Sequence, residues 1–166
     1  MTLKNKKAVF AGGCFWGLED LLRDQTGVIT TEAGYTGGTN ENPTYQSHPG
    51  HAEAVEITYD PSLVSYKQLL DFFFQIHNPT TLNQQGNDRG TSYRSAIFYG
   101  DATEKEIAEE MIEIVNKSKR WDGPVVTTLE HLTKFWPAEE YHQDYLIKNP
   151  GGYTCHAIYF GSYLEG

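Results

Sequence analysis

The spacing of apolar and polar residues along the chain predicts alternating strands and helices. Five segments are rich in β-branched or aromatic residues, or alternate in polarity with the period of two that strands show. They are residues 7–10, 28–33, 51–59, 93–99 and 125–132. Helical spacing, capping boxes or a proline at the first turn predict helices in four further segments. They are residues 15–23, 65–76, 103–115 and 138–146.

The order of these elements predicts the fold class. It begins β-α-β-β-α-β, which is the order of the ferredoxin-like split βαβ unit. We therefore expect an α/β (α+β) fold, a two-layer sandwich with helices packed on one face of a mixed sheet. The 166 residues contain no repeat or linker-like run, so a single domain over residues 1–166 is expected. A glycine-rich tail, about residues 149–166, completes it.

The charge of the chain narrows the choice of partners. Thirteen Lys and Arg residues against 22 Asp and Glu residues give a formal net charge of −9. This acidic excess disfavours nucleic acid and anionic membrane surfaces, because both attract Lys and Arg. The first residues do not form a signal peptide, and no apolar run is long enough to span a membrane. We therefore expect a cytoplasmic protein without nucleic-acid or membrane partners.

Two cysteines, Cys14 and Cys155, are the first candidates for chemistry. A domain of this size folds without a disulfide, and in a reducing compartment a thiol is more often free or catalytic. Cys14 follows two glycines at the start of an expected helix, where free N–H groups and the helix dipole stabilise a thiolate. The alternative is a small apolar residue that fills the core. Phe15 and Trp16 are then either core aromatics or an apolar wall beside the thiol.

Glu53 lies in a strand with strict alternation. Its side chain shares one face of residues 51–59 with Val55, Ile57 and Tyr59, so the carboxyl group is expected to point inward. Desolvation raises the pKa of a carboxyl group, and an inward Glu53 would stay protonated near neutral pH and act as an acid. If the end of the strand reaches water, Glu53 instead titrates normally.

Two loops rich in Asn, Asp, Gly and Pro carry tyrosines. Tyr45 ends the segment 42–45, and Tyr93 ends the segment 86–93. A phenol remains a hydrogen-bond donor at neutral pH, so such residues can hold an oxygen that gains negative charge. Ordinary turn chemistry explains the same loop composition without a function.

Motifs for metals and cofactors do not occur in the sequence. The six histidines lack the paired spacing of a zinc site, and HExxH, GxGxxG and a Walker loop are missing. We expect no metal and no cofactor. Two other classes remain open, namely a cysteine hydrolase in which His51 or His142 activates Cys14, and a binding module that uses its tyrosines for stacking.

Seven short motifs together resemble the type A peptide-methionine sulfoxide reductases over nearly the whole chain. They are residues 13–17, 34–38, 42–45, 50–54, 85–88, 93–95 and 141–143, in the order that the family shows. The resemblance implies a thiol enzyme that reduces the S epimer of methionine sulfoxide, free or in peptides and proteins. It also implies thioredoxin as the final reductant. We expect the chain to act as a monomer.

The resemblance implies a role for each residue of the reacting centre. Cys14 would be the nucleophile, and Glu53 would protonate the sulfoxide oxygen while Tyr45 and Tyr93 hold it. An acid is required because a thiolate that attacks the sulfur must expel oxygen, which leaves only when protonated. Cys14 would become a sulfenic acid, which a second thiol captures as a disulfide.

The remaining roles concern the substrate and the second thiol. By resemblance, Phe15 and Trp16 would enclose the methyl group, and Asp88 would position the substrate or a water. Cys155 would be the resolving cysteine. It lies in the glycine-rich tail, where a thiol that must travel would be placed, although a surface cysteine without a role is the alternative. Family members commonly carry this cysteine directly after Gly-Tyr, whereas Thr154 intervenes here.

Overall fold

The architecture comes from a computed structural model that describes residues 4–154 and 156–164. Cys155 therefore lies outside the described residues. The principal elements are β1 (Lys6–Gly12), α1 (Phe15–Arg23), β2 (Val28–Thr36), β3 (Ala52–Tyr59), α2 (Tyr66–Gln75), β6 (Ser95–Tyr99), α3 (Ala102–Ser118) and β7 (Thr128–His131). The shorter ones are β4 (Gln84–Gln85), β5 (Asp88–Arg89), β8 (Trp136–Pro137), α4 (Tyr145–Lys148) and the 3-10 turns η1 (Thr91–Tyr93) and η2 (Glu140–His142).

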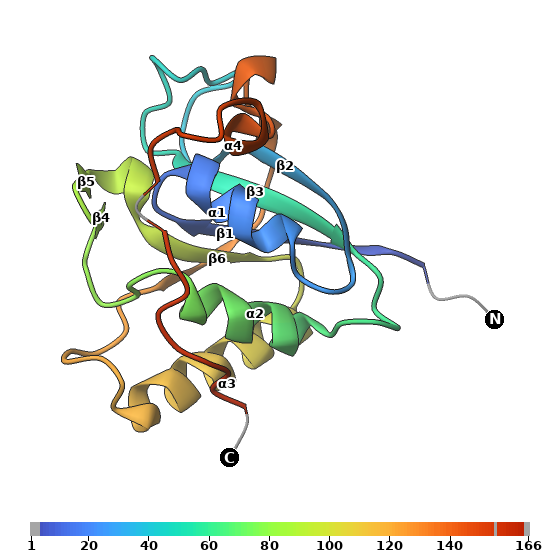
Figure 1. Ribbon diagram of the computed structural model, residues 1–166, viewed down its shortest axis with the longest axis vertical. Helices are drawn as coiled ribbons and strands as arrows, with labels where there is room; N and C mark the ends of the chain where they lie inside the picture. Colours follow the sequence, from blue (N-terminus) through green and yellow to red (C-terminus); the bar gives the residue numbers. More distant parts are fainter. Residues whose placement is uncertain (1–3, 155, 165–166) are drawn as a thin grey trace.

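The main sheet confirms the expected fold class. Its strand order is β7-β6-β1-β3-β2-β8, and the inner four strands pair antiparallel in the order of the ferredoxin-like unit. At the edge β7 runs parallel to β6, which makes the sheet mixed. Figure 1 shows α1 and α2 over one face of the sheet, with α3 beside α2. None of the described helices has the length and apolar character needed to cross a membrane.

The alternation in β3 places its side chains as the sequence predicts. Val55, Ile57 and Tyr59 are almost completely buried in the core between sheet and helices. Glu53 points to the same side and is 1% exposed. The opposite face carries the small residue Ala54, which is buried in a second cluster against the segment that includes Phe135. Both faces of the strand are therefore covered.

The helix expected over residues 138–146 is wrong. Trp136 and Pro137 instead form β8 at the sheet edge, where a proline costs little because its missing N–H faces no partner strand. The Ala138 N–H then donates to the Ala33 carbonyl at 2.8 Å. The Gln143 side chain bonds both backbone groups of Ala33, each at 2.8 Å. Ala138 and Gln143 therefore hydrogen-bond with backbone groups on the edge of β2 and do not belong to a helix.

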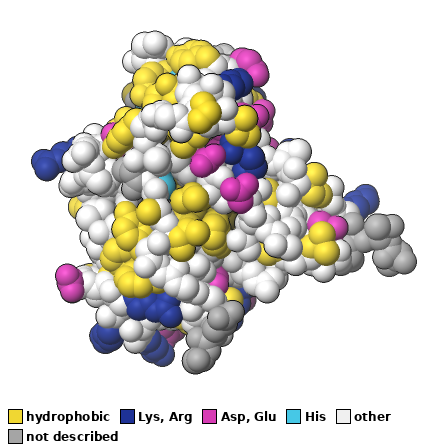
Figure 2. Space-filling model, in the orientation of Figure 1, with side chains coloured by type: hydrophobic (Ala, Val, Ile, Leu, Met, Phe, Trp, Pro, Cys, Tyr) yellow, Lys and Arg dark blue, Asp and Glu magenta, His cyan; other side chains and the backbone are white. Residues whose placement is uncertain are grey.

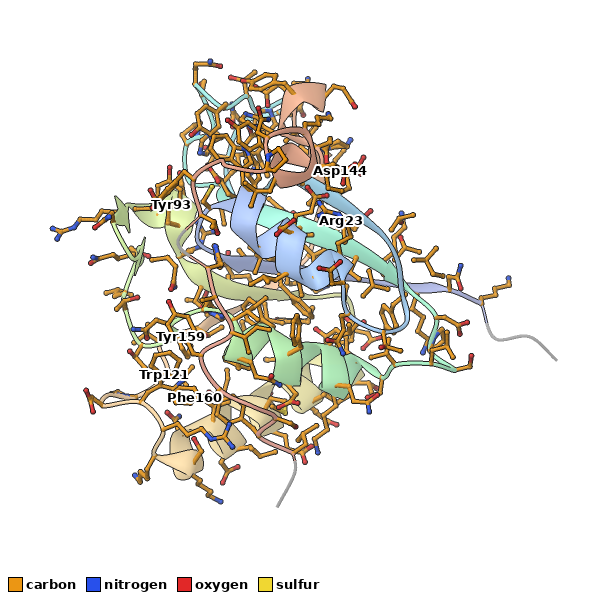
Figure 3. The ribbon with its side chains drawn as sticks, viewed as in Figure 1. Arg23, Tyr93, Trp121, Asp144, Tyr159 and Phe160 are labelled. Carbon is orange, nitrogen blue, oxygen red and sulfur yellow. The ribbon has the colours of Figure 1, made fainter. Side chains whose placement is uncertain are left out.

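The glycine-rich tail is packed against the domain over residues 156–164. It crosses α2 and runs toward α3 (Figure 1), and the Asp71 carboxylate accepts from the Tyr163 N–H and the Ser162 hydroxyl, both at 2.7 Å. Trp121 lies against the rings of Tyr159 and Phe160 (Figure 3). Hydrophobic side chains gather on this face, where the tail crosses α2 (Figure 2). Residues 159–163 are therefore held by contacts with α2 and with Trp121.

Candidate active site

A thiol lies at the start of α1, as the sequence predicts, and it is buried. β1 ends at Gly12, and Gly13 has φ +98°, a left-handed conformation that glycine adopts without strain. A Cβ at Gly13 would also lie 2.7 Å from the Gln85 side chain. Cys14 follows as the N-cap residue of α1 and is 7% exposed. The thiol therefore lies beside the N–H groups and the positive end of the helix dipole, which favour a thiolate.

Glu53 reaches the same helix start from β3. Its Oε1 accepts a hydrogen bond of 3.1 Å from the Phe15 N–H, the first residue of α1. Its Oε2 is buried and has no hydrogen-bond partner within the described part of the chain. Burial raises the pKa of Glu53 to about 8, the Phe15 N–H lowers it, and the charge of Asp88 raises it further. Glu53 is therefore mostly protonated at neutral pH, with one oxygen available to a ligand.

Tyr45 and Tyr93 face this pair from two loops. Burial is the main cause that raises the pKa of each phenol, and negative charge on Glu53 or Cys14 raises it further. A hydrogen bond joins the two phenols. Tyr93 ends η1 near the start of α1 (Figure 3). Both phenols thus keep their protons and can donate to an oxygen in the site.

Trp16 and Phe15 occupy different surroundings. Phe15 is completely buried, whereas Trp16 is half-buried and stacks on Tyr145 with a centroid distance of 3.7 Å. The residue before Tyr145, Asp144, points toward Arg23 of α1 (Figure 3), and their side chains pair at 3.1 Å. Trp16 and Tyr145 therefore form an aromatic wall, and the Asp144–Arg23 ion pair ties the segment of Tyr145 to α1.

His142 contacts Trp16, a pairing that the sequence did not predict. Its Nδ1 accepts from Trp16 Nε1 at 2.9 Å, and its ring packs near those of Phe15 and Tyr45 at 5.1 Å and 4.6 Å. Because Nδ1 is an acceptor, Nε2 carries the proton, and Nε2 is buried without a partner among the described residues. The motif at 141–143 was the available signal, but the expected helix gave no reason to place it here.

The histidines do not form the hydrolase arrangement. His51 uses both ring nitrogens within its own loop, since Nδ1 accepts from the Gly38 N–H at 3.0 Å and Nε2 pairs with the Asn40 carbonyl at 2.9 Å. His142 is committed to Trp16. Neither histidine is thus arranged as a general base for Cys14. Over the described residues, no three His, Cys, Asp or Glu side chains are grouped to hold a metal ion.

Asp88 and the sequence neighbours of Cys155 also lie near these residues. The Tyr153 hydroxyl donates to Asp88 Oδ2 at 3.2 Å. His156 is buried, and its Nε2 is 2.6 Å from the Gly12 carbonyl oxygen. A Cβ at Gly17 would overlap Thr154 Oγ1 and lie 2.5 Å from His156 Nδ1. Thr154 therefore packs against Gly17, and His156 packs against Gly12 and Gly17, two glycines near Cys14 in the sequence.

A buried cysteine at a helix start, near a carboxyl group with a raised pKa and two phenols that keep their protons, is typical of a thiol-dependent enzyme. The peptide methionine sulfoxide reductase family model matches residues 6–162. A relative from Nocardia farcinica, peptide methionine sulfoxide reductase MsrA, is 60% identical over 151 residues, which cover 91% of this chain and 89% of that protein. The chain belongs to the peptide methionine sulfoxide reductase family and is a reductase of methionine sulfoxide.

Solved structures agree with this assignment. Mxr1 from Saccharomyces cerevisiae in reduced form superimposes with a TM-score of 0.85 at 36% identity, covering 95% of this chain and 93% of that one. The same yeast protein in complex with Trx2 matches with a TM-score of 0.64 at 26% identity, covering 95% and 91% of the two chains. The mixed sheet and its helices are thus those of a known reductase fold.

Proposed function

We propose that this protein reduces the S epimer of methionine sulfoxide, free or in peptides and proteins, through a sulfenic acid on Cys14. The observation that carries the proposal is the Glu53 carboxyl group. It is protonated near neutral pH, and its Oε2 is buried and unpartnered within the described residues, beside the helix start that holds the thiol. Such an oxygen suits a ligand that accepts a proton.

In the first step the Cys14 thiolate attacks the sulfoxide sulfur while Glu53 delivers its proton to the oxygen. The attack forms a bond between the Cys14 sulfur and the substrate sulfur, and the protonated oxygen becomes a hydroxyl group. The hydroxyl group then passes to the Cys14 sulfur, the substrate sulfur–oxygen bond and the bond between the two sulfurs both break, and methionine leaves as the sulfide. Tyr45 and Tyr93 donate hydrogen bonds to the oxygen as it gains charge. Glu53 then takes back the proton that Cys14 released when it ionised.

In this proposal Trp16 and Phe15 enclose the methyl group of the substrate, and Asp88 positions the substrate or a water. Trp16 suits this role because it lies two residues after Cys14, is half-buried, and has a ring that is held by His142 and Tyr145. Phe15 is completely buried, so its ring would form the inner side of this enclosure.

Cys155 is the proposed resolving cysteine. Its thiol attacks the sulfur of the sulfenic acid, a disulfide to Cys14 forms, and water leaves. Contacts of Thr154 and His156 with the glycines beside Cys14 support this role. We propose thioredoxin as the reductant of the disulfide, in keeping with the yeast Mxr1 structure in complex with Trx2. The enzyme would act as a monomer in the cytoplasm, where thioredoxin is kept reduced, and would repair oxidised proteins.

A single-turnover experiment tests the proposal. Reduced protein is mixed with a methionine-S-sulfoxide peptide without added reductant, the methionine peptide is measured by chromatography, and the disulfide is sought by mass spectrometry. We expect one methionine and one Cys14–Cys155 bridge per chain, and neither product from Cys14→Ser. A hydrolase would consume no thiol, and thiols that stay intact while wild-type protein is saturated with substrate would contradict the proposal.

A further inference from the structure

A carboxylate outside the reacting centre joins two tyrosines near it. Glu139 lies between β8 and η2, and its Oε1 accepts from the Tyr35 hydroxyl at 2.8 Å. Its Oε2 accepts from the Tyr45 N–H at 2.9 Å. The three residues come from β2, from the loop after it and from the segment after β8, so one side chain connects three parts of the chain.

The two partners differ in how firmly they are held. Tyr35 is 0% exposed, packs 5.6 Å from the Phe15 ring and stacks 4.9 Å from the His48 ring, so it belongs to the rigid floor of the site. Tyr45 is half-buried and lies in the irregular loop between β2 and β3. Glu139 therefore ties the Tyr45 backbone, in an irregular loop, to Tyr35, a buried residue of β2.

We infer that Glu139 is a positioning residue, whose carboxylate spans Tyr35 and Tyr45 and so fixes the Tyr45 phenol where the sulfoxide oxygen binds. The inference rests on the proposed function, because it assumes that Tyr45 donates to that oxygen. A phenol stabilises a developing charge only when its hydroxyl is held at the right place before the reaction. Glu139 supplies that constraint through the backbone of Tyr45, not by contact with the substrate.

Two conservative variants separate the effect of the length of the Glu139 side chain from the effect of its charge. In Glu139→Gln the amide oxygen can accept from the Tyr45 N–H, and the amide NH₂ can donate to the Tyr35 hydroxyl oxygen, which also accepts. Glu139→Asp keeps the charge but is one methylene shorter and cannot reach both partners. If Glu139 acts by bridging Tyr35 and Tyr45, Glu139→Gln should keep the single-turnover rate within about threefold of wild type. Glu139→Asp and Glu139→Ala should lower this rate by about 10- to 100-fold.

The test measures single-turnover formation of methionine for these variants, for Tyr45→Phe and for Glu139→Ala/Tyr45→Phe. Glu140→Ala is the matched control, because Glu140 is the next residue and its side chain is 91% exposed. Alkylation of Cys14 by iodoacetamide should proceed at the wild-type rate in every Glu139 variant. The double variant should be no slower than the slower single variant, since both changes remove the same interaction.

Three results would overturn the inference. They are additive losses in the double variant, a faster Glu139→Asp than Glu139→Gln, or a fall in Cys14 alkylation that matches the fall in turnover. Each of them is informative only if wild-type protein forms methionine. Absence of methionine with the wild-type protein would instead count against the proposed function, so the two failures are distinguishable.

Discussion

Replacing Glu53 by glutamine should make the protein more stable and less active at neutral pH. The pKa of Glu53 rises from 4.5 to about 8 on folding, because burial disfavours the carboxylate. Between these values the folded chain holds a proton that the unfolded chain has lost, so wild-type stability falls as pH increases. The slope is about 1.4 kcal/mol per pH unit, and the total is on the order of 5 kcal/mol.

Glu53→Gln removes this titration and keeps the shape of the side chain. The amide oxygen can still accept from the Phe15 N–H, as Oε1 of Glu53 does. The difference in unfolding free energy between variant and wild type should therefore grow in favour of the variant from pH 4.5 to 8 and stay constant outside this window. Urea unfolding of both proteins at half-unit pH intervals, followed by tryptophan fluorescence, measures the difference directly.

The same variant should reduce methionine sulfoxide at least about 100-fold more slowly in single turnover, because an amide cannot deliver a proton. The wild-type rate should fall above pH 8 as Glu53 ionises, and the residual rate of Glu53→Gln should lack this step. Wild-type turnover in the variant would refute the acid role. Parallel stability profiles of the two proteins across pH 4.5 to 8 would refute the argument from burial.

Three further predictions concern the tail and the aromatic wall. Cys155→Ser should release one methionine per chain but lose cycling with thioredoxin, and steady-state turnover at the wild-type rate would remove Cys155 from the mechanism. Gly17→Ala should slow disulfide formation and lower stability by about 1–3 kcal/mol, since its methyl group meets the tail; Gly151→Ala, with open space around it, is the control in thermal melts and rapid-quench assays. His142→Phe should raise KM about 10-fold in steady-state kinetics, because Trp16 loses its hydrogen-bond acceptor, and an unchanged KM would contradict this.

Local signals explain why much of the fold is predictable. The capping box at Ser65 forms as expected, since the Gln68 N–H donates to Ser65 Oγ at 3.1 Å and the Ser65 N–H to Gln68 Oε1 at 2.9 Å. The sequence also predicts a capping box that begins at Thr103, but Asp101 caps α3 instead and accepts from the Glu104 N–H at 2.8 Å. Both Asp and Thr are good N-caps, so local sequence alone does not choose between them.

The site is only partly predictable for a different reason. Cys14 at a helix start and Glu53 on the inner face of a strand follow from local periodicity. The remaining contacts join residues far apart in the chain, such as Trp16 with His142 across 126 positions and Tyr45 with Glu139 across 94. These contacts depend on sheet register and on the β8 edge pairing that replaced the expected helix. Motif order indicated that these residues belong together, but not which atoms meet.

The energetic penalty of burying Glu53 is tied to its chemistry. A solvated glutamate with a pKa of 4.5 is less than about 1% protonated at pH 7 and would rarely act as an acid. With a pKa of about 8, Glu53 holds the proton at pH 7 and binds one again after each turnover. The two carboxyl oxygens then have separate tasks. Oε1 is held by the Phe15 N–H, and the unpartnered Oε2 presents the proton. Because Phe15 directly follows Cys14, the hydrogen bond from the Phe15 N–H joins the acid on β3 to the same backbone that carries the nucleophile.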